Sequence, residues 1–352
     1  MNLSKLTQIL EKEPAYRLKQ VKETVFVNLI EDWEQAKFLP KELRQKLVIE
    51  CPLEIKGEIF SSKSRASLKS LITLEDGLKV EAVLMKHPER NTICVSSQVG
   101  CPLGCAFCAT GKMGFKRNLT ADEIVEQVVF FLRFLSLNSP TSPKYLRIVF
   151  MGMGEPFLNY DNVLSAIRIL NDPDGLKIGA RKISISTVGI TEGIEKLANE
   201  GLEVNLAISL HAPENPLRTQ IIPTNQKYPI EKILNAVNYY IGKTNRKVMF
   251  EYLMIQGIND SEEHAHKLAK LMKHKLYMVN LIAYNLEQSE KLVTRTPKMS
   301  ESYNETGDFK PSSVETIKTF GGILEKEGIN CTQRFKFGDD INAACGQLAG
   351  KA

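Results

Sequence analysis

Apolar and polar residues recur along the chain with two different rhythms, and the change between them falls near residue 90. In the first part, apolar positions have the spacing of short amphipathic helices. The predicted helices cover residues 3–10, 21–33 and 41–50. An alternating apolar pattern from Leu78 to Leu84 then predicts a pair of strands. We therefore expect a small helical N-terminal domain over residues 1–75 and a strand-pair extension over residues 76–92.

From residue 93 onward, short apolar segments alternate with amphipathic ones. The apolar segments are long enough for strands that are buried on both faces, and they cover residues 93–97, 146–150, 182–186, 204–210, 248–255 and 278–284. With the helices between them they form about six βα units of an α/β fold. Eight units would close a full barrel, so six predict an open, partial barrel over residues 93–352, with a doubly wound sheet as the alternative. The polar stretch 286–311 is expected to be a long surface loop.

Composition narrows the class of protein. A hydrophobic share of 43% and a charged share of 25% are typical of a globular chain. No apolar run approaches the roughly 18 residues that span a bilayer, and the start of the chain lacks the pattern of a secretory signal. We therefore expect a cytoplasmic protein without membrane contact. The net charge of +5 permits binding to a polyanion without requiring it.

The strongest chemical signal is a group of cysteines directly after the first predicted βα strand. Three of the seven cysteines, Cys101, Cys105 and Cys108, fall within eight residues, which in a cytosolic chain indicates a metal or cluster site. Three thiolates on a cubane iron–sulfur cluster leave one iron open to an outside ligand. The alternative is a structural zinc site, which needs a fourth ligand, and Cys94 could supply it. A zinc-stabilised RNA-binding module without catalysis therefore remains open at this point.

Further candidates lie where predicted strands end. The glycines of Met151-Gly-Met-Gly-Glu155 allow close approach of the backbone, and Glu155 could accept a hydrogen bond from a ligand ammonium. Each such residue alone fits a turn or a helix cap equally well, but their convergence on one rim is what a ligand site requires. The other strand-end candidates are Ser186, Ser209, Leu210, His211 and Asn285.

Single residues outside these motifs carry little signal alone. Cys345, among alanines, has the pattern of a small buried apolar residue, and Cys51 and Cys331 have that of core thiols. Glu81 by itself is expected to be a solvent-facing strand residue. The basic residues near the cluster loop or in the N-terminal helices could contact phosphates, or could simply form a solvated charged surface. They are Lys112, Lys116, Arg117, Arg17, Lys19 and Lys22.

Four longer strings are more specific. They are CVSSQVGCPLGCAFCATGKMGFKRNLT (94–120), MGMGEP (151–156), SLHAP (209–213) and DDINAACGQLAG (339–350). Together they resemble the RlmN/Cfr family of radical S-adenosylmethionine (SAM) rRNA adenine methyltransferases, over essentially the whole chain. The resemblance implies a [4Fe-4S] cluster on the three clustered cysteines and two SAM molecules per turnover. It also implies that SAM is contacted by Gly154, Glu155, Ser186, Ser209, Leu210, His211 and Asn285.

The resemblance also assigns three catalytic roles. Cys345 matches the cysteine that takes a methyl group from one SAM, and a radical derived from the second SAM then activates that methyl for addition to the base. Glu81 matches the proposed acceptor of the ring proton. Cys94 matches the thiol that captures the sulfur of Cys345 as a disulfide. The implied partners are 23S rRNA, with tRNA as a further candidate, and a flavodoxin- or ferredoxin-type electron donor; the expected state is a monomer, with an RNA-binding N-terminal domain.

Within this family the methyl can go to adenine C2 or, in Cfr-like enzymes that confer antibiotic resistance, to C8. The strings GMGEP, SLHAP and FGDDINAACGQLAG look more like the C2 enzymes. The segment after Asn285 departs from the family pattern because it is long and lacks an NPFPG-type run, which leaves substrate detail open. Radical SAM enzymes that act on peptides usually carry further cysteine clusters toward the C-terminus, and this sequence has none.

Overall fold

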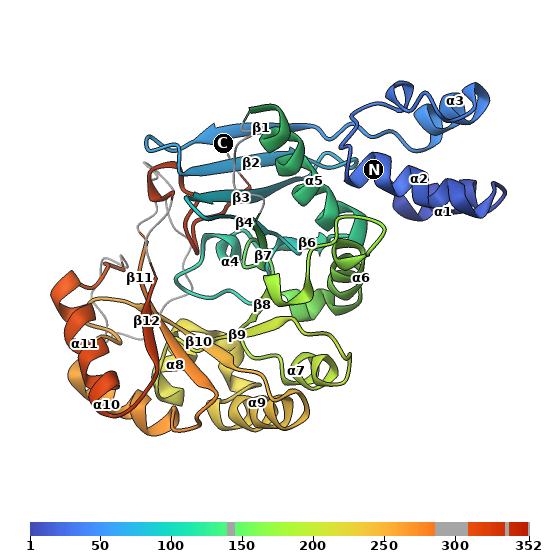
Figure 1. Cartoon of the computed structure of the whole chain (residues 1–352). Coiled ribbons are helices and arrows are strands. Elements are labelled where there is room, and N and C mark those ends of the chain that lie inside the picture. Colours follow the sequence, from blue (N-terminus) through green and yellow to red (C-terminus); the bar gives the residue numbers. More distant parts are fainter. Residues whose placement is uncertain (139–144, 286–308, 335–337, 351–352) are drawn as a thin grey trace.

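The computed structural model describes residues 1–138, 145–285, 309–334 and 338–350. Within these residues one ten-stranded sheet curves through the molecule in the order β1-β2-β3-β4-β7-β8-β9-β10-β11-β12, as Figure 1 shows. Its strands are β1 (Gly57–Ser61), β2 (Ser67–Thr73), β3 (Lys79–His87), β4 (Arg90–Val95), β7 (Leu146–Phe150), β8 (Ile183–Thr187), β9 (Asn205–Ser209), β10 (Val248–Met254), β11 (Tyr277–Ala283) and β12 (Cys331–Gln333). A separate small hairpin consists of β5 (Gln98–Gly100) and β6 (Phe115–Asn118).

The predicted open barrel of six βα units is confirmed. β4, β7, β8, β9, β10 and β11 are parallel neighbours, and their helices lie on the outer, convex side of the sheet (Figure 1). Those helices are α5 (Ala121–Asn138), α6 (Tyr160–Asn171), α7 (Thr191–Ala198), α8 (Asn215–Ile221), α9 (Ile230–Thr244), α10 (Glu262–Leu271) and α11 (Val314–Lys326). The short parallel strand β12 was not predicted, because three residues are too few to show a periodic pattern.

The two faces of β10 show how the barrel is built. Tyr252 points outward, where its ring lies 5.3 Å from that of Phe320 on α11. The neighbouring Glu251 must point to the opposite face because side chains alternate along a strand. There Asn280 of β11 donates to its carboxylate at 2.7 Å. The barrel therefore has an apolar layer under its helices and polar groups in its interior.

The N-terminal part is less helical than predicted. Its helices α1 (Leu3–Leu10), α2 (Ala15–Phe26) and α3 (Lys41–Glu50) end at Glu50, and β1 and β2 follow where residues 1–75 were expected to be helical. β2 is buried along almost its whole length although it contains Lys69 and Ser70, so buried polar residues interrupt the apolar pattern. Of the strand pair expected over residues 76–92, β3 is present; it belongs to the main sheet, where its neighbours are β2 and β4, the first strand of the barrel.

Buried polar contacts attach the N-terminal helices to the barrel. Arg133 of α5 donates to the carbonyl oxygens of Leu53, at 2.8 Å, and Ile30. Trp33 is buried and donates to the carbonyl of Cys51 at 2.6 Å. Cys51 is only 1% exposed, which confirms it as a core thiol, whereas Cys331 on β12 is half-buried.

Two further findings bear on the predictions. Among the described residues, no helix combines the length and apolar character needed to cross a membrane. Residues 286–308 of the predicted surface loop lie outside the described part of the chain.

Candidate active site

The three clustered cysteines lie in one loop between β5 and α4 (Ala109–Lys112), at the carboxyl end of β4. Burial raises the pKa of Cys101 to about 12, and the neighbouring Cys108 thiol adds to the rise. Burial also raises the pKa of Cys105 well above its usual range, with further increases from Cys108 and Cys101. Cys108 thus acts on both other thiols and Cys101 acts on Cys105, so the three form one group.

The donor set of this loop fits an iron–sulfur cluster with one open iron. Gly100 has φ 74°, and a Cβ there would lie 1.8 Å from the carbonyl oxygen of Gly114, so only glycine lets the loop close against β6. No three His, Cys, Asp or Glu side chains in the described residues lie close enough to hold a single metal ion. Ligands to separate irons of one cluster do not need that closeness. Cys94, the fourth ligand that a zinc site would require, instead lies at a cavity that Cys345 and Arg334 also line.

The Met-Gly-Met-Gly-Glu turn after β7 packs against the segment that leads into the cluster loop. A Cβ on Gly152 would lie 2.7 Å from Ser96 Oγ, and one on Gly154, where φ is 97°, would lie 2.5 Å from Gln98 Cβ. The backbone N–H of Glu155 donates to the Gln98 side chain at 2.9 Å. The glycines therefore bring Glu155 close to the cluster loop.

Glu155 is a buried carboxylate with backbone partners. It is 3% exposed and accepts hydrogen bonds from the N–H groups of Phe157, at 3.0 Å, and Val188, at 2.9 Å. Burial raises its pKa to about 7, and these hydrogen bonds oppose the rise. Its charge also contributes to the raised pKa values of Cys101 and Cys105. Glu155 therefore titrates near neutral pH within reach of the cluster ligands.

The ends of β8 and β9 bring the next candidates together. The hydroxyl oxygens of Ser186 and Ser209 lie 3.4 Å apart. His211 has φ 59°, and its Nδ1 accepts from the N–H of Leu253 at 3.0 Å. Burial lowers the pKa of His211 to about 3, so the ring is neutral. Its ring meets Phe107 of the cluster loop edge-on, with 4.9 Å between ring centroids.

A buried arginine that the sequence did not single out supports this rim. Arg218 of α8 is 0% exposed and donates to the carbonyls of Leu210, at 3.0 Å, and Ser209, at 3.1 Å. Burial lowers its pKa to about 10. Arg218 holds the backbone of the Ser209–His211 segment in place. A lone arginine in a short polar helix carries no sequence signal for this role.

Two other cysteines, Cys94 and Cys345, meet at a second centre. Cys94, Asn285, Arg334 and Cys345 line one cavity, together with Met85, Met151, Ile282, Ala283, Ala343, Ala344 and Leu348. Asn285 donates to the carbonyl of Cys345 at 3.4 Å, and its own buried Oδ1 has no hydrogen-bond partner among the described residues. Burial raises the pKa of Cys94 to about 12; Cys345 adds to this rise and Arg334 opposes it.

The second centre adjoins the cluster loop. The N–H of Ala109, next to Cys108, donates to the carbonyl of Gly346 at 2.7 Å. The hydroxyl of Thr110 donates to the carbonyl of Leu348 at 2.6 Å. Helix α4 therefore holds the segment that carries Cys345 against the loop of the clustered cysteines.

Glu81 is buried, so the expectation of a solvent-facing residue is wrong. It is 1% exposed, forms an ion pair with Lys69 at 3.0 Å, and accepts from the N–H of Ala349 at 2.9 Å. Both β2 and β3 are covered on this face, and the C-terminal segment lies over the carboxylate. Glu81 thus contacts the segment of Cys345 without being among the residues that line the cavity.

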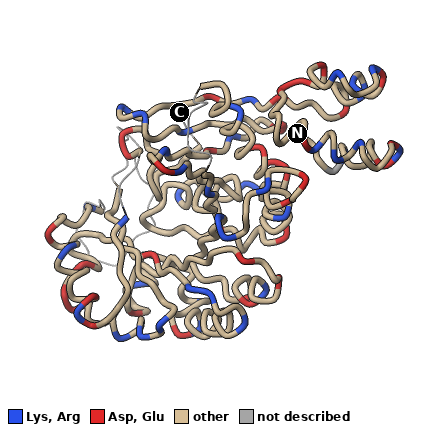
Figure 2. Tube along the Cα trace, viewed as in Figure 1, with Lys and Arg blue, Asp and Glu red and all other residues tan. Residues whose placement is uncertain are grey.

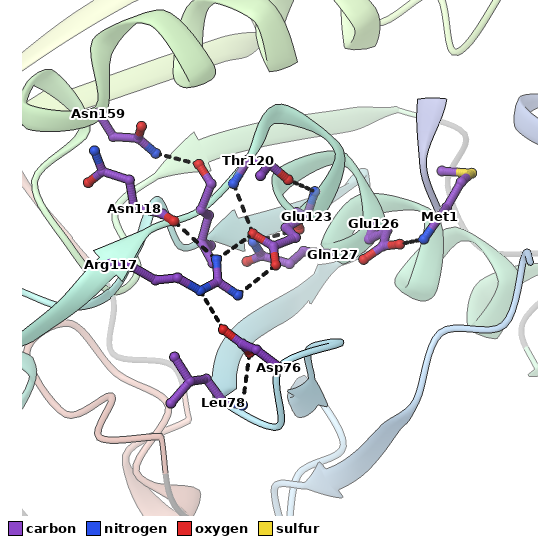
Figure 3. A network of polar contacts seen from close by, with 11 residues as sticks. Met1, Asp76, Leu78, Arg117, Asn118, Thr120, Glu123, Glu126, Gln127 and Asn159 are labelled. Atoms are coloured by element: carbon purple, nitrogen blue, oxygen red, sulfur yellow. Dashed lines mark hydrogen bonds and ion pairs between the residues drawn. The ribbon is translucent and has the colours of Figure 1, made fainter. Parts of the chain in front are cut away.

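Several basic residues proposed for RNA contact have carboxylate partners within the chain. Arg117 forms two hydrogen bonds of 2.8 Å with Glu123 and one of 2.6 Å with Asp76, as Figure 3 shows. Lys22 and Lys19 pair with carboxylates near the end of α6, at 2.7 and 3.2 Å. Figure 2 shows acidic and basic residues interspersed along the N-terminal helices. These side chains are therefore partly engaged in holding the structure together.

Comparison with known proteins agrees with this geometry. The model of the Radical SAM superfamily matches residues 95–269. A Chloroflexus aurantiacus protein named "Probable dual-specificity RNA methyltransferase RlmN" is 43% identical over 99% of this chain and 92% of its own length. A Dictyoglomus thermophilum protein of the same name is 45% identical over 96% of this chain and 91% of its own length.

A solved structure agrees as well. The crystal structure of a radical SAM methyltransferase from Sphaerobacter thermophilus has a TM-score of 0.90 and 40% sequence identity, and the match covers 100% of this chain and 98% of that one. With such identity over nearly its full length, and with three cysteines in one loop at the mouth of a partial barrel, the chain belongs to the RlmN family of radical SAM RNA methyltransferases.

Proposed function

We propose that this enzyme methylates carbon C2 of an adenine in 23S rRNA, with tRNA as a second candidate substrate. The observation that carries the proposal is the meeting of Cys94 and Cys345 at one cavity beside the cluster loop. A methyl relay through one cysteine, followed by release through another, needs two thiols in such a place. Membership of a methyltransferase family removes the alternative of a zinc-stabilised module without catalysis.

We assign the binding of the cluster to Cys101, Cys105 and Cys108. The bound cluster would chelate SAM and supply the electron for its reductive cleavage. The buried carboxylate of Glu155 pairs with the ammonium of SAM, and the hydroxyls of Ser186 and Ser209 are placed for its polar groups. This assignment also includes Gly154, Leu210, His211 and the unpartnered Oδ1 of Asn285.

The methyl relay follows from the reactivity of the base. C2 of adenine is an electron-poor carbon, so it cannot displace a methyl from a sulfonium, whereas a thiolate can. Cys345 accordingly accepts the methyl first, and this carbon is later joined to C2. Glu81 then accepts the ring proton. The electron released with this proton would return to the oxidised cluster. The Cys94 thiolate then attacks the sulfur of Cys345 and the bond from that sulfur to the methylene carbon breaks. The carbon keeps the electron pair and takes up a proton to become the methyl group, so that a disulfide forms and the RNA is released. The use of two SAM molecules per turnover follows from this order.

Mass spectrometry of 23S rRNA and tRNA from cells with and without the gene tests this function. We expect one adenine to lose a methyl group on C2 when the gene is deleted. A methyl on C8 instead would support the Cfr-like alternative and contradict the C2 assignment. If deletion of the gene removed no methyl group from either RNA, the proposal as a whole would be contradicted.

We further infer a cytoplasmic enzyme that receives electrons from a flavodoxin- or ferredoxin-type protein, because its proposed RNA substrate is cytoplasmic and its cluster has to be reduced. We also expect this enzyme to be a monomer. The N-terminal helices are the part we assign to RNA binding. This assignment rests on their position at one end of the sheet, away from the barrel helices (Figure 1). Gel filtration tests the oligomeric state. RNA binding by variants with Lys-to-Gln changes in these helices tests the assignment of RNA binding to them.

A further inference from the structure

Arg334 brings a buried positive charge to the cavity of the two cysteines. It follows β12, and its backbone N–H donates to the carbonyl of Leu281, which extends the parallel pairing beyond the strand. Its guanidinium contacts Met151 of the cavity wall, with 3.7 Å from Nη1 to the sulfur. Among the residues that line the cavity, Arg334 is the one whose side chain is a basic group.

The carboxylate that influences the pKa of Arg334, that of Glu251, does not form an ion pair with it. Glu251 of β10 is 4% exposed, and its bond from Asn280 orients it within the barrel. The same Asn280 accepts from Thr332 at 3.1 Å, two residues before Arg334. Burial raises the pKa of Glu251 and Arg334 opposes that rise, but the described residues place no carboxylate within ion-pair distance of the guanidinium. The described residues therefore give the guanidinium no ion-pair partner, and it lines the same cavity as the two thiols.

The pKa of Arg334 agrees with its place in the cavity that Cys94 and Cys345 also line. The thiolate of Cys345 is the largest influence that raises the pKa of Arg334; burial opposes it, and Glu251 and Cys94 raise it further. A positive charge in the same cavity as a thiol favours the anionic form of that thiol over its neutral form. A cation beside a cysteine is the usual means of making its thiol nucleophilic at neutral pH.

We propose that Arg334 is a positioning residue that prepares the two cysteines in turn, first Cys345 for methyl transfer and then Cys94 for release. The proposal rests on the proposed function. In the first step the thiol of Cys345 loses its proton to solvent and its electron pair forms the bond to the methyl carbon. The bond from that carbon to the sulfonium sulfur breaks, and its electron pair leaves with the thioether product.

The single cation explains the order of the two steps. While Cys345 is a thiolate, its negative charge disfavours ionisation of Cys94. Once methylated, Cys345 is uncharged, and the guanidinium is left with Cys94 as its remaining thiol. One arginine thus serves two thiolates that are never needed together.

Alkylation by iodoacetamide tests this role without RNA or SAM. The full-length, anaerobically reconstituted enzyme is reduced, shown by mass spectrometry to carry unmethylated Cys345, and alkylated between pH 6.5 and 9.5. The rate is read from the peptide that contains Cys345. In Arg334→Gln we expect alkylation at pH 7 to be about 3- to 10-fold slower, because loss of the charge reduces the thiolate fraction while the remaining thiolate is somewhat more reactive.

The pH dependence separates activation from a structural effect. The difference in rate between Arg334→Gln and the wild type should shrink as the pH rises toward 9.5, because high pH ionises a thiol without the help of a cation. Arg334→Lys keeps the charge and should retain most of the rate, whereas Arg334→Met provides a second neutral variant if Arg334→Gln folds poorly. The control is Arg246→Gln, since Arg246 binds the carbonyl of Val204 and the side chain of Asn205 at the other end of β9.

An unchanged rate in both neutral variants, or a slowing by the same factor at every pH, would overturn the proposal. Because the assay needs no RNA, it also separates this inference from the proposed function. Normal activation of Cys345 with no methyl found in RNA would contradict the substrate assignment while leaving the role of Arg334 supported.

Discussion

Replacing Glu155 by Gln tests the assigned SAM site most directly. The carboxylate is fully buried, and its pKa of about 7 lies well above the ordinary 4.5. A rise of that size means that ionising Glu155 costs about 3 kcal/mol more in the folded chain than in the unfolded one. The folded state is therefore favoured by this group below about pH 4.5, and that contribution is lost as the pH rises through about 7.

A ligand ammonium beside Glu155 reverses this cost, because it pairs with the ionised form. SAM should therefore bind the ionised form of Glu155, and its binding should release a proton near neutral pH. Below pH 7 the ionised fraction falls by about tenfold per pH unit, so the affinity for SAM should fall with it and level off above pH 7. The Gln variant has no such ionisation and should show a flat profile.

The size of the effect follows from the bond that is lost. A charge-assisted hydrogen bond contributes roughly 1.5–3 kcal/mol, so Glu155→Gln should weaken SAM binding by about 10- to 150-fold at pH 8. Cluster content should not change, because no cluster ligand is altered. Equilibrium dialysis with labelled SAM on the reconstituted enzyme measures both quantities, and Glu203→Gln, at an exposed ion pair, is the matched control. Unchanged affinity in Glu155→Gln, or a flat profile in the wild type from pH 6 to 7.5, would refute the assignment.

Three other outcomes can be checked with simple variants. The reconstituted enzyme should be brown with about four irons, and Cys108→Ala should lose SAM cleavage; stoichiometric zinc without sulfide would contradict this. Cys94→Ala should stall as a covalent protein–RNA adduct, visible as a shifted band on a denaturing gel, whereas Cys345→Ala should form none; equal behaviour of the two would contradict their separate roles. Gly154→Ala should lower the free energy of unfolding by roughly 2–4 kcal/mol because of its positive φ and the contact with Gln98, whereas Gly242→Ala in α9, with open space, should be neutral or stabilising by up to about 1 kcal/mol; equal melting temperatures would contradict this.

Local patterns were sufficient to predict the barrel and the cluster loop. A strand of a parallel sheet is buried on both faces, so segments such as 248–255 and 278–284 are recognisable without knowing their neighbours. The three cluster ligands lie within eight residues, so their proximity is already a property of the chain. Both features depend on residues that are close in sequence.

The N-terminal strands could not be predicted in this way. β2 contains Lys69 and Ser70 at buried positions, and Lys69 is stabilised there by Glu81 of the next strand. Such a segment forms a strand because it pairs with a neighbouring strand, and not because its own residues alternate between apolar and polar. The same pairing explains why Glu81 is buried, although its own segment reads as half-exposed.

The second centre was decided by tertiary structure alone. Cys94 ends β4, Arg334 follows β12 and Cys345 lies in the C-terminal segment, so that some 240 to 250 residues separate the first from the others. Apart from the family resemblance, which links Cys94 to Cys345, the sequence shows a cysteine among alanines and an arginine without a motif, and neither indicates a partner. Curvature of the sheet brings the end of β12 and the C-terminal segment to the mouth beside β4. A charge can act on a thiol only at short range, and that distance is set by the fold.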